Sequence, residues 1–396
     1  MKIADVRTFV VGNPPPGFGG RYFVFLKLVT DGGVEGLGEA YSPPFGPDVV
    51  VRMIEDVCQR RVLGRNPFEI EKLWRTIYAT GYSQRPDPTL GAVLSAIEMA
   101  CWDIVGKELG RPVYDLLGGR VHERLRAYSY LYPEPDDVED VYRNPELAAE
   151  RACAYAAQGF TAVKFDPVGA YTAFDPRQLS PASLDRVEHF VRCVREAVDD
   201  RCDLLIGTHG QLTPAAALRL ARRLEPYDPL WLEEPVPPES PEAMARVARG
   251  TTIPIATGER LVGKHEFARV LATGAASILQ MNAGRVGGIL EAKKIAGIAE
   301  AHYAQIAPHL YCGPIVGAAN IQLAACSPNF LILEGIRRWD GFYAELLRKP
   351  IRWEDGYVLP PSEPGLGVEL DEAVAARHPY TGDRLHLEMQ DEPAGD

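Results

Sequence analysis

Short apolar runs alternate with amphipathic helical stretches from about Arg126 onward, and this repeat limits the fold more than any other feature of the chain. Eight runs have the length and composition of buried strands: AYSYLY (127–132), TAVKF (161–165), DLLIG (203–207), PLWLE (229–233), IPIAT (253–257), SILQM (277–281), AQIAP (304–308) and FLILE (330–334). Four of the helical stretches between them begin with a capping side chain followed by proline, at Asn144-Pro145, Ser180-Pro181, Thr213-Pro214 and Ser240-Pro241. Eight strands with intervening helices predict a closed (β/α)₈ barrel.

The first part of the chain has a different pattern. Strand-like segments and the turn-rich DGGVEGLGEAY come first, and helical periodicity follows over residues 47–62, 67–80 and 89–109. We therefore predict an α+β amino-terminal domain over 1–125 and the barrel over 126–345. The segment 346–396 is too short for another domain, so we expect it to pack back on the first, with MQDEPAGD as a frayed tail.

Charge and composition exclude several classes of protein. The formal net charge is −12 and there is no basic run, which argues against nucleic acid as a partner. The seven Cys residues have no CxxC spacing, as is typical of reduced thiols. The amino terminus lacks the apolar stretch of a signal peptide, and no run of about 18 apolar residues occurs. We expect a cytoplasmic protein without a membrane partner.

Polar residues follow the predicted strands at regular intervals. They are Lys164 and Asp166 after the second strand, Gly207 to Gln211 after the third, Glu233 and Glu234 after the fourth, Glu259 after the fifth, Asn282 after the sixth, His309 after the seventh and Glu334 after the eighth. From position 207 the steps are 26, 26, 23, 27 and 25 residues, about one strand and helix each. The carboxyl ends of barrel strands carry the active site in enzymes of this fold, so these residues are the first candidates for function.

The residue types indicate acid, base and metal chemistry. Glu233 and Glu259 end neighbouring strands and could hold Mg²⁺, which prefers oxygen ligands; the alternative is that they cap the next helices or pair with Arg260 or Lys264. His209 and His309 flank that pair and could exchange protons with a bound molecule. Lys164 could serve as a base or contact a carboxylate, or it could form a salt bridge with Asp166 or Glu233. The other six His residues lie in helices, loops or the tail, where we expect structural roles.

Seven segments together resemble the enolase superfamily, in its mandelate racemase branch and close to galactonate and gluconate-type acid-sugar dehydratases. They are AIEMACWDIVGKELGRPVYDLLGG, AVKFDP, THGQLTP, WLEEPVPPE, ATGER, GRVGGILEAKKIA and APHLYCGP, and the resemblance extends over essentially the whole chain. The resemblance implies a modified barrel with a capping domain, and an acidic Mg²⁺ ligand after each of strands three, four and five. Glu233 and Glu259 match the second and third ligands, whereas the first position is Gly207.

Two more positions depart from the family pattern. Asn282 stands where the resemblance implies an Asp that would polarise His309, and Gln211 stands where the dehydratases usually have Arg. An amide carries no charge to stabilise imidazolium, so His309 should be a weaker base. Without an acid at 207, Mg²⁺ should bind weakly or give way to another divalent cation, unless His209, Asp166 or Thr208 substitutes.

The resemblance implies a hydro-lyase for a small carboxylate. His309 would remove the proton next to the carboxylate of a sugar acid, a metal would stabilise the enediolate, and His209 would protonate the departing hydroxyl to give a 2-keto-3-deoxy acid. Two alternatives stay open: a descendant that binds a small acid without turnover, and a racemase or epimerase with Lys164 opposite His309.

Substrate contacts are expected from the capping domain and the strand ends. The resemblance places two specificity loops at Asn13 to Arg21 and Tyr78 to Pro88. The candidate contacts are Arg21, Tyr82, Arg85, Gln211 and Glu334. Relatives of this kind are homo-oligomers, so a dimer or octamer is expected.

Overall fold

The computed structural model describes residues 1–82 and 84–394. Its amino-terminal part is an antiparallel sheet of β1 (Ile3–Gly12), β2 (Tyr22–Thr30) and β3 (Glu35–Ala40), with β2 in the centre. The sheet is followed by α1 (Pro47–Val57), a π-helical turn (Cys58–Val62), α2 (Ile70–Tyr78) and α3 (Pro88–Leu109). The predicted α+β order is confirmed, and α3 ends at Gly110 in the left-handed conformation as its sequence indicated.

Helix α3 is the core of this part of the molecule. It is long and apolar enough to cross a membrane by composition, but 83% of its most apolar window is buried inside the protein. Strand β3 lies so close to it that a Cβ at Gly38 would be 1.9 Å from the carbonyl oxygen of Ala96. The glycines of the GLGE segment therefore allow the sheet and the helix to pack against each other.

Eight parallel strands form the barrel, which confirms the predicted fold class. They are β4 (Leu125–Tyr130), β5 (Ala162–Phe165), β6 (Asp203–Gly207), β7 (Trp231–Glu233), β8 (Ile255–Thr257), β9 (Ile278–Leu279), β10 (Gln305–Ile306) and β11 (Leu333–Glu334). Each pairs with the next up to β10, and β11 pairs with β4. Backbone hydrogen bonds from Ile306 to Asn329 and from Leu331 to Ile306 close the ring. A hairpin of β12 (Trp353–Glu354) and β13 (Tyr357–Val358) adds to β4 on the outside.

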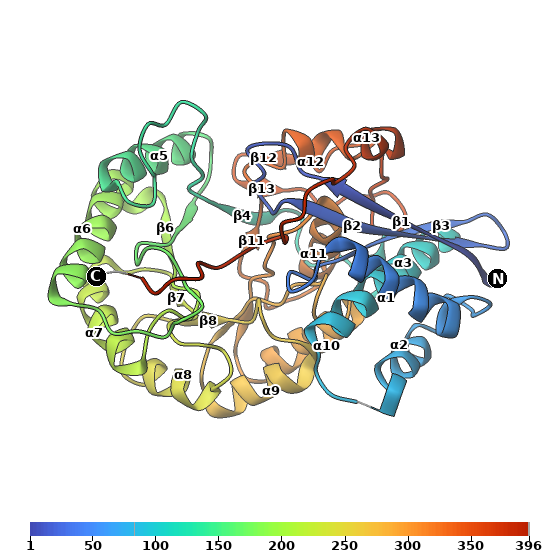
Figure 1. The fold of residues 1–396 in the computed structure, drawn as a ribbon, viewed down its shortest axis with the longest axis horizontal. Coiled ribbons are helices and arrows are strands. Elements are labelled where there is room, and N and C mark those ends of the chain that lie inside the picture. The colour runs from blue at the N-terminus through green and yellow to red at the C-terminus, as the bar shows by residue number, and fades with distance from the viewer. Residues whose placement is uncertain (83, 395–396) are drawn as a thin grey trace.

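Helices surround the barrel strands, as Figure 1 shows. They are α5 (Pro145–Ala157), α6 (Pro181–Val198), α7 (Pro214–Leu224), α8 (Pro241–Ala248), α9 (Gly263–Thr273), α10 (Ile289–Ala301), α11 (Pro314–Ala325) and the short α12 (Phe342–Glu345). The helices α4 (Val113–Leu116) and α13 (Glu372–Arg377) lie outside this ring of strand and helix units. All four predicted caps are present, because the side chains of Asn144, Ser180, Thr213 and Ser240 each accept a hydrogen bond from the first turn of their helix.

Two buried carboxylates of the amino-terminal part cap barrel helices. Glu39 on β3 accepts hydrogen bonds from the backbone amides of Gly313 and Val316 at the start of α11. Glu98 on α3 accepts from the amides of Ile289 and Leu290 at the start of α10, at 2.9 Å or less. Neither barrel helix has a cap from its own side chains, so the two parts of the chain complete each other.

The carboxyl-terminal segment runs from α13 across the face of the barrel (Figure 1). The prediction of a frayed tail is wrong for Gln390, whose carbonyl accepts a hydrogen bond from the amide of Ala173 at 2.9 Å. Further back, the ring of His386 is buried between the carbonyls of Tyr22 and Tyr311, at 2.8 and 3.0 Å. The segment is therefore held in place by hydrogen bonds to the amino-terminal sheet and to barrel loops, and it does not extend into solvent at Gln390.

Candidate active site

A cavity of about 340 Å³ lies at the carboxyl ends of the barrel strands. It brings together Asp166, His209, Glu259 and His309, four of the residues predicted from strand ends. Aromatic side chains and the carboxyl-terminal segment form much of the remaining wall: Tyr41, Tyr130, Tyr132, Tyr142, Tyr171, Tyr311, Leu387 and Gln390. A wider opening beside it is lined by Arg260 and Arg285 as well as by His209 and Glu259. This is the position expected for an active site in a barrel of this type.

Glu233 does not line this cavity, because it is buried below it in a network of donors. Its carboxylate accepts hydrogen bonds from Lys164 Nζ at 2.7 Å, Gln280 Nε2 at 2.7 Å and Trp231 Nε1 at 3.1 Å. Burial raises the pKa of the Glu233 carboxyl to about 7, and the charge of Lys164 opposes that rise. Lys164 is fully buried and also lies 3.7 Å from Glu334 Oε1. Of the two alternatives for Lys164, the structure shows the salt bridge with Glu233.

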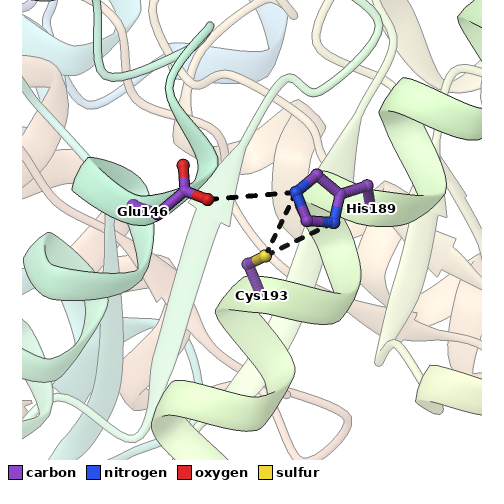
Figure 2. Close-up of side chains that lie close together, drawn as sticks. All are labelled: Glu146, His189 and Cys193. Atoms are coloured by element: carbon purple, nitrogen blue, oxygen red, sulfur yellow. Dashed lines mark hydrogen bonds and ion pairs between the residues drawn. The ribbon is translucent and has the colours of Figure 1, made fainter.

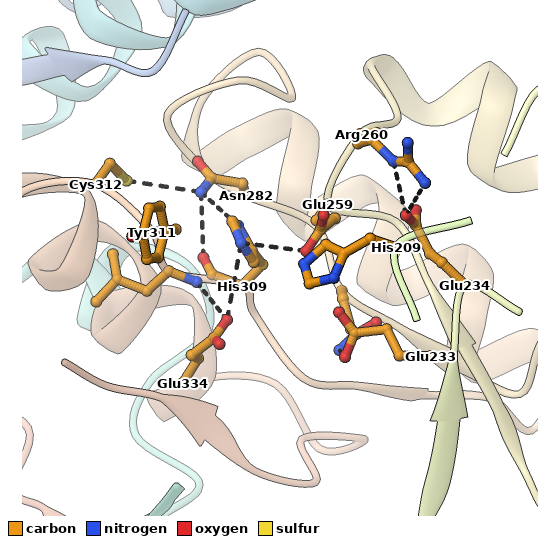
Figure 3. A network of polar contacts seen from close by, with 12 residues as sticks. His209, Glu233, Glu234, Glu259, Arg260, Asn282, His309, Tyr311, Cys312 and Glu334 are labelled. Atoms are coloured by element: carbon orange, nitrogen blue, oxygen red, sulfur yellow. Dashed lines mark hydrogen bonds and ion pairs between the residues drawn. The ribbon is translucent and has the colours of Figure 1, made fainter. Parts of the chain in front are cut away.

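Asn282 determines which nitrogen of His309 carries the proton (Figure 3). The amide oxygen of Asn282 accepts from the backbone amide of Gly284 at 2.8 Å, so its NH₂ group faces His309 Nδ1 at 3.0 Å. Reversing the amide would bring two donors together at Gly284. Nδ1 must therefore accept, and the proton of the neutral ring is on Nε2, which lies 3.3 Å from Glu259 Oε2. Burial also lowers the pKa of His309, which favours the neutral ring.

His209 pairs with Asp166 on the other side of the cavity. Its Nδ1 lies 3.1 Å from Asp166 Oδ2, within ion-pair distance but not aligned as a regular hydrogen bond. Burial of the ring opposes its charge, but Asp166 outweighs burial and raises the pKa of His209 to about 9. His209 also has a positive φ of 45°, a strained backbone conformation for a residue with a side chain.

Two arginines supply positive charge at the wider opening. Arg260 is paired with Glu234, with Nε 2.7 Å from Oε2. Arg285 donates to the backbone carbonyl of Glu259 at 2.9 Å and lies over the ring of Tyr41, while its buried Nε has no partner among the described residues. Arg285 was not among the residues predicted from the sequence, although it lies within the GRVGG segment after the sixth strand.

The residues at the strand ends do not fit a Mg²⁺ ion held by Glu233 and Glu259. Position 207 has no side chain, Glu233 is hydrogen-bonded to three protein donors, and Glu259 faces His309 instead of a second free carboxylate. Within the described part of the chain, no three His, Cys, Asp or Glu side chains at this face come within 4.8 Å of one another. Mg²⁺ requires several oxygen ligands in near-octahedral geometry, which this arrangement does not offer.

A group that could hold a metal ion lies elsewhere, on the outside of the barrel (Figure 2). Glu146 on α5 and His189 and Cys193 on α6 place one ligand atom each within 4.8 Å of the others. A thiol and an imidazole suit a softer ion than Mg²⁺. Glu146 is exposed to solvent and His189 is partly buried, and the group lies on helices outside the barrel, away from the cavity.

The remaining candidate residues do not line the cavity, although Glu334 Oε2 lies 4.0 Å from His309 Nε2. Gln211 is buried and donates to the carbonyl of Gly169 at 2.9 Å, and Glu334 accepts from the amide of Leu310 at 2.8 Å. Arg21 binds the carbonyl of Leu385 and lies 3.1 Å from Glu388, so it anchors the tail. Tyr82 is 97% exposed, and Arg85 lines a separate small pocket beside α2. Residue 83 of the loop Tyr78 to Pro88 lies outside the described residues.

Sequence comparison places both parts of the chain in one family. Residues 18–118 match the mandelate racemase / muconate lactonizing enzyme N-terminal domain, and residues 146–374 match the enolase C-terminal domain-like family. The chain belongs to the mandelate racemase/muconate lactonizing enzyme family. A crystal structure of a family member from Labrenzia alexandrii is 63% identical, with a TM-score of 0.97 over 100% of both chains.

Curated relatives of this family member have names that indicate dehydratase activity. D-galactonate dehydratase of Ralstonia nicotianae is 37% identical over 94% of this chain and 93% of its own length. D-xylonate dehydratase of Haloferax volcanii is 34% identical over 97% of this chain and 90% of its own length. The family resemblance deduced from the strand-end motifs is thus confirmed.

Proposed function

We propose that this protein is a hydro-lyase that removes water from a sugar acid. The observation that carries the proposal is that two imidazoles and the carboxylate of Glu259 line one cavity at the strand ends of a chain with acid-sugar dehydratases among its relatives. In the reaction, the carbon next to the carboxylate loses a proton, the next carbon loses its hydroxyl as water, and the enol product rearranges to a 2-keto-3-deoxy acid. These transfers need a proton acceptor and a proton donor within reach of adjacent carbons.

The charges around the cavity support an anionic substrate. Arg285 lies at the wider opening beside Arg260, whose charge is balanced by Glu234, and Asp166 raises the pKa of His209 to about 9, so that its ring is charged at neutral pH. The unpartnered Nε of Arg285 could donate to a carboxylate there. The residues at the strand ends do not fit a Mg²⁺ ion, so the proposed proton transfers use only side chains of this protein.

A second candidate function is binding of a small acid without turnover. It is favoured by one observation: Lys164, Gln280 and Trp231 already donate three hydrogen bonds to Glu233, the carboxylate that would be a metal ligand in the family pattern. The racemase alternative has no such support, since Lys164 is fully buried in its pair with Glu233 and does not line the cavity.

The test is a screen of acid sugars, including D-galactonate, D-xylonate and D-gluconate, with a 2-keto acid assay. It is run with EDTA and with millimolar Mg²⁺ on the wild type and on His209→Asn and His309→Asn. We expect keto acid from at least one sugar acid and its loss in both variants. Binding by calorimetry without any keto acid across the screen would instead establish the second candidate.

A further inference from the structure

Gly207 leaves a space that the side chain of Asp166 fills. A Cβ at position 207 would lie 2.0 Å from Asp166 Oδ1, and 3.4 Å from the hydroxyl of Tyr130. Strands β5 and β6 are neighbours, with Phe165 opposite Ile206, so Asp166 emerges beside Gly207. Any side chain at 207 would therefore displace the Asp166 carboxylate from its present position.

The displaced carboxylate would be the partner of His209. Asp166 Oδ2 lies 3.1 Å from His209 Nδ1, and both side chains are more than four-fifths buried. His209 thus has a carboxylate at its Nδ1, whereas the acidic neighbours of His309, Glu259 and Glu334, lie at its Nε2 side, at 3.3 and 4.0 Å. An acidic partner stabilises the imidazolium and fixes the ring, as in other Asp–His pairs.

The partner at Nδ1 of His309 is a hydrogen-bond donor, whereas the partner at Nδ1 of His209 is a carboxylate. Asn282 donates to Nδ1 of His309 at 3.0 Å, and the orientation of that amide is set by the amide of Gly284. A neutral ring with Nδ1 occupied by a donor has no free lone pair on Nε2, so it can give a hydrogen bond but cannot take a proton. The neutral histidine of triosephosphate isomerase is a known case of such an electrophilic imidazole.

We propose that the Gly207 and Asn282 departures form one rearrangement, in which Asp166 and His209 are the charged pair of the site and His309 is a neutral Nε2–H donor. The inference deepens the proposed function and rests on it for the reaction. In the dehydration, His209 gives a ring proton to the departing hydroxide to form water. His309 hydrogen-bonds to the oxygen on which charge develops, and the carboxylate of Glu259, in contact with His309, accepts the proton from carbon. Gly207 is then a positioning residue that makes room for Asp166.

The experiment is nitrogen NMR of the protein labelled with ¹⁵N at histidine, at pH 7, which reports the protonated nitrogens of each ring. We expect His309 to be neutral with its proton on Nε2, and His209 to carry protons on both nitrogens. In Asn282→Asp the His309 proton should appear on Nδ1. In Asp166→Asn, His209 should lose its charge, and Gly207→Ala should have the same effect although it leaves Asp166 in the sequence.

Gly297→Ala is the matched control, because a Cβ at Gly297 meets nothing within 4 Å. The proposal is overturned if wild-type His309 carries its proton on Nδ1, or if His209 keeps its charge in Asp166→Asn. If Gly207→Ala fails to fold, Asp166→Asn and Asn282→Asp still decide the matter. The readout needs no turnover, so a failed sugar-acid screen with the expected proton positions would remove the proposed function and leave this assignment standing.

Discussion

Among single residues, Lys164 supplies the cation that neutralises a buried carboxylate beneath the cavity. Its buried ammonium group pairs with Glu233 and lies near Glu334, where the family pattern would have a metal ion close to Glu233. A buried carboxylate must be paired with a cation or protonated, so the lysine and a metal ion are alternative ways to neutralise Glu233. A salt bridge of Lys164 with Asp166 or Glu233 was one of the alternatives expected from the sequence, and the structure shows that the partner is Glu233.

This arrangement predicts that Mg²⁺ does not stabilise the wild type. Millimolar Mg²⁺ should leave its Tm unchanged, while Lys164→Met should lose about 3 to 5 kcal/mol because two buried carboxylates lose their cation. Part of that loss should return with Mg²⁺ in the variant, as followed by thermal unfolding. Lys349→Met, at an exposed position, is the control and should change little. A Mg²⁺-dependent rise in the wild-type Tm that disappears in Glu259→Gln would contradict the prediction.

At the scale of elements, barrel helices are completed by side chains from another part of the chain. Glu39 on β3 caps α11, and Glu98 on α3 caps α10. Burial raises the pKa of the Glu39 carboxyl to about 7, although the amides of Val316 and Gly313 lower it. A carboxyl group with a raised pKa in the folded state binds protons more tightly there than in the unfolded chain.

The stability of the wild type relative to Glu39→Gln should therefore fall as pH rises from about 4.5 to about 7, and level off above that range. Between these two pKa values the Glu39 carboxyl is protonated in the folded protein but ionised in the unfolded chain. A rise in pH therefore favours the unfolded chain. Urea unfolding of both proteins at several pH values measures this difference. Glu150→Gln, at an exposed position, should show no such trend. A difference that stays constant or grows with pH would show that Glu39 is ionised in the folded protein at low pH.

At the scale of the whole molecule, the carboxyl-terminal segment joins the amino-terminal sheet to the barrel. Arg21 holds Leu385 and Glu388, His386 fits against Gly20, and Gln390 pairs with the loop after β5. Leu387 and Gln390 form part of the cavity wall. The carboxyl-terminal segment therefore helps to close the cavity. The loop Asn13 to Arg21 contacts this segment through Arg21, and so both ends of the chain contribute to the closure.

Truncation of the chain after Gly382 should loosen the two loops that the segment contacts, the loop Asn13 to Arg21 and the loop after β5. Amide hydrogen exchange should become faster at Arg21 and Ala173, whose amides donate to the carbonyls of His386 and Gln390, and in the loops around them, while the barrel strands keep their protection. Mass spectrometry of the truncated and full-length proteins measures this directly. Met389→Ala, at an exposed side chain, should leave the rates unchanged. Unchanged exchange at 171–173 after truncation would mean that the segment does not hold that loop.

Much of the site could be located from sequence because strand ends recur with the period of a strand and a helix. Asp166, His209, Glu259 and His309 were placed at one end of the barrel by that spacing, and they line one cavity. The partners of these residues could not be located in the same way. Asp166 enters the space beside Gly207, and Arg285 and Leu387 reach the opening from segments with no periodic signal.

The barrel, the strand-end residues and the helix starts at Asn144, Ser180, Thr213 and Ser240 could be predicted, because each depends on local periodicity or on a cap a few residues away. Three features emerge only on folding: Glu233 faces Lys164 instead of the cavity, Asn282 donates to His309 Nδ1, and the last residues cover the barrel. Those outcomes depend on contacts between residues far apart in the chain, whose distances and donor directions are set only when the strands and both chain ends pack together.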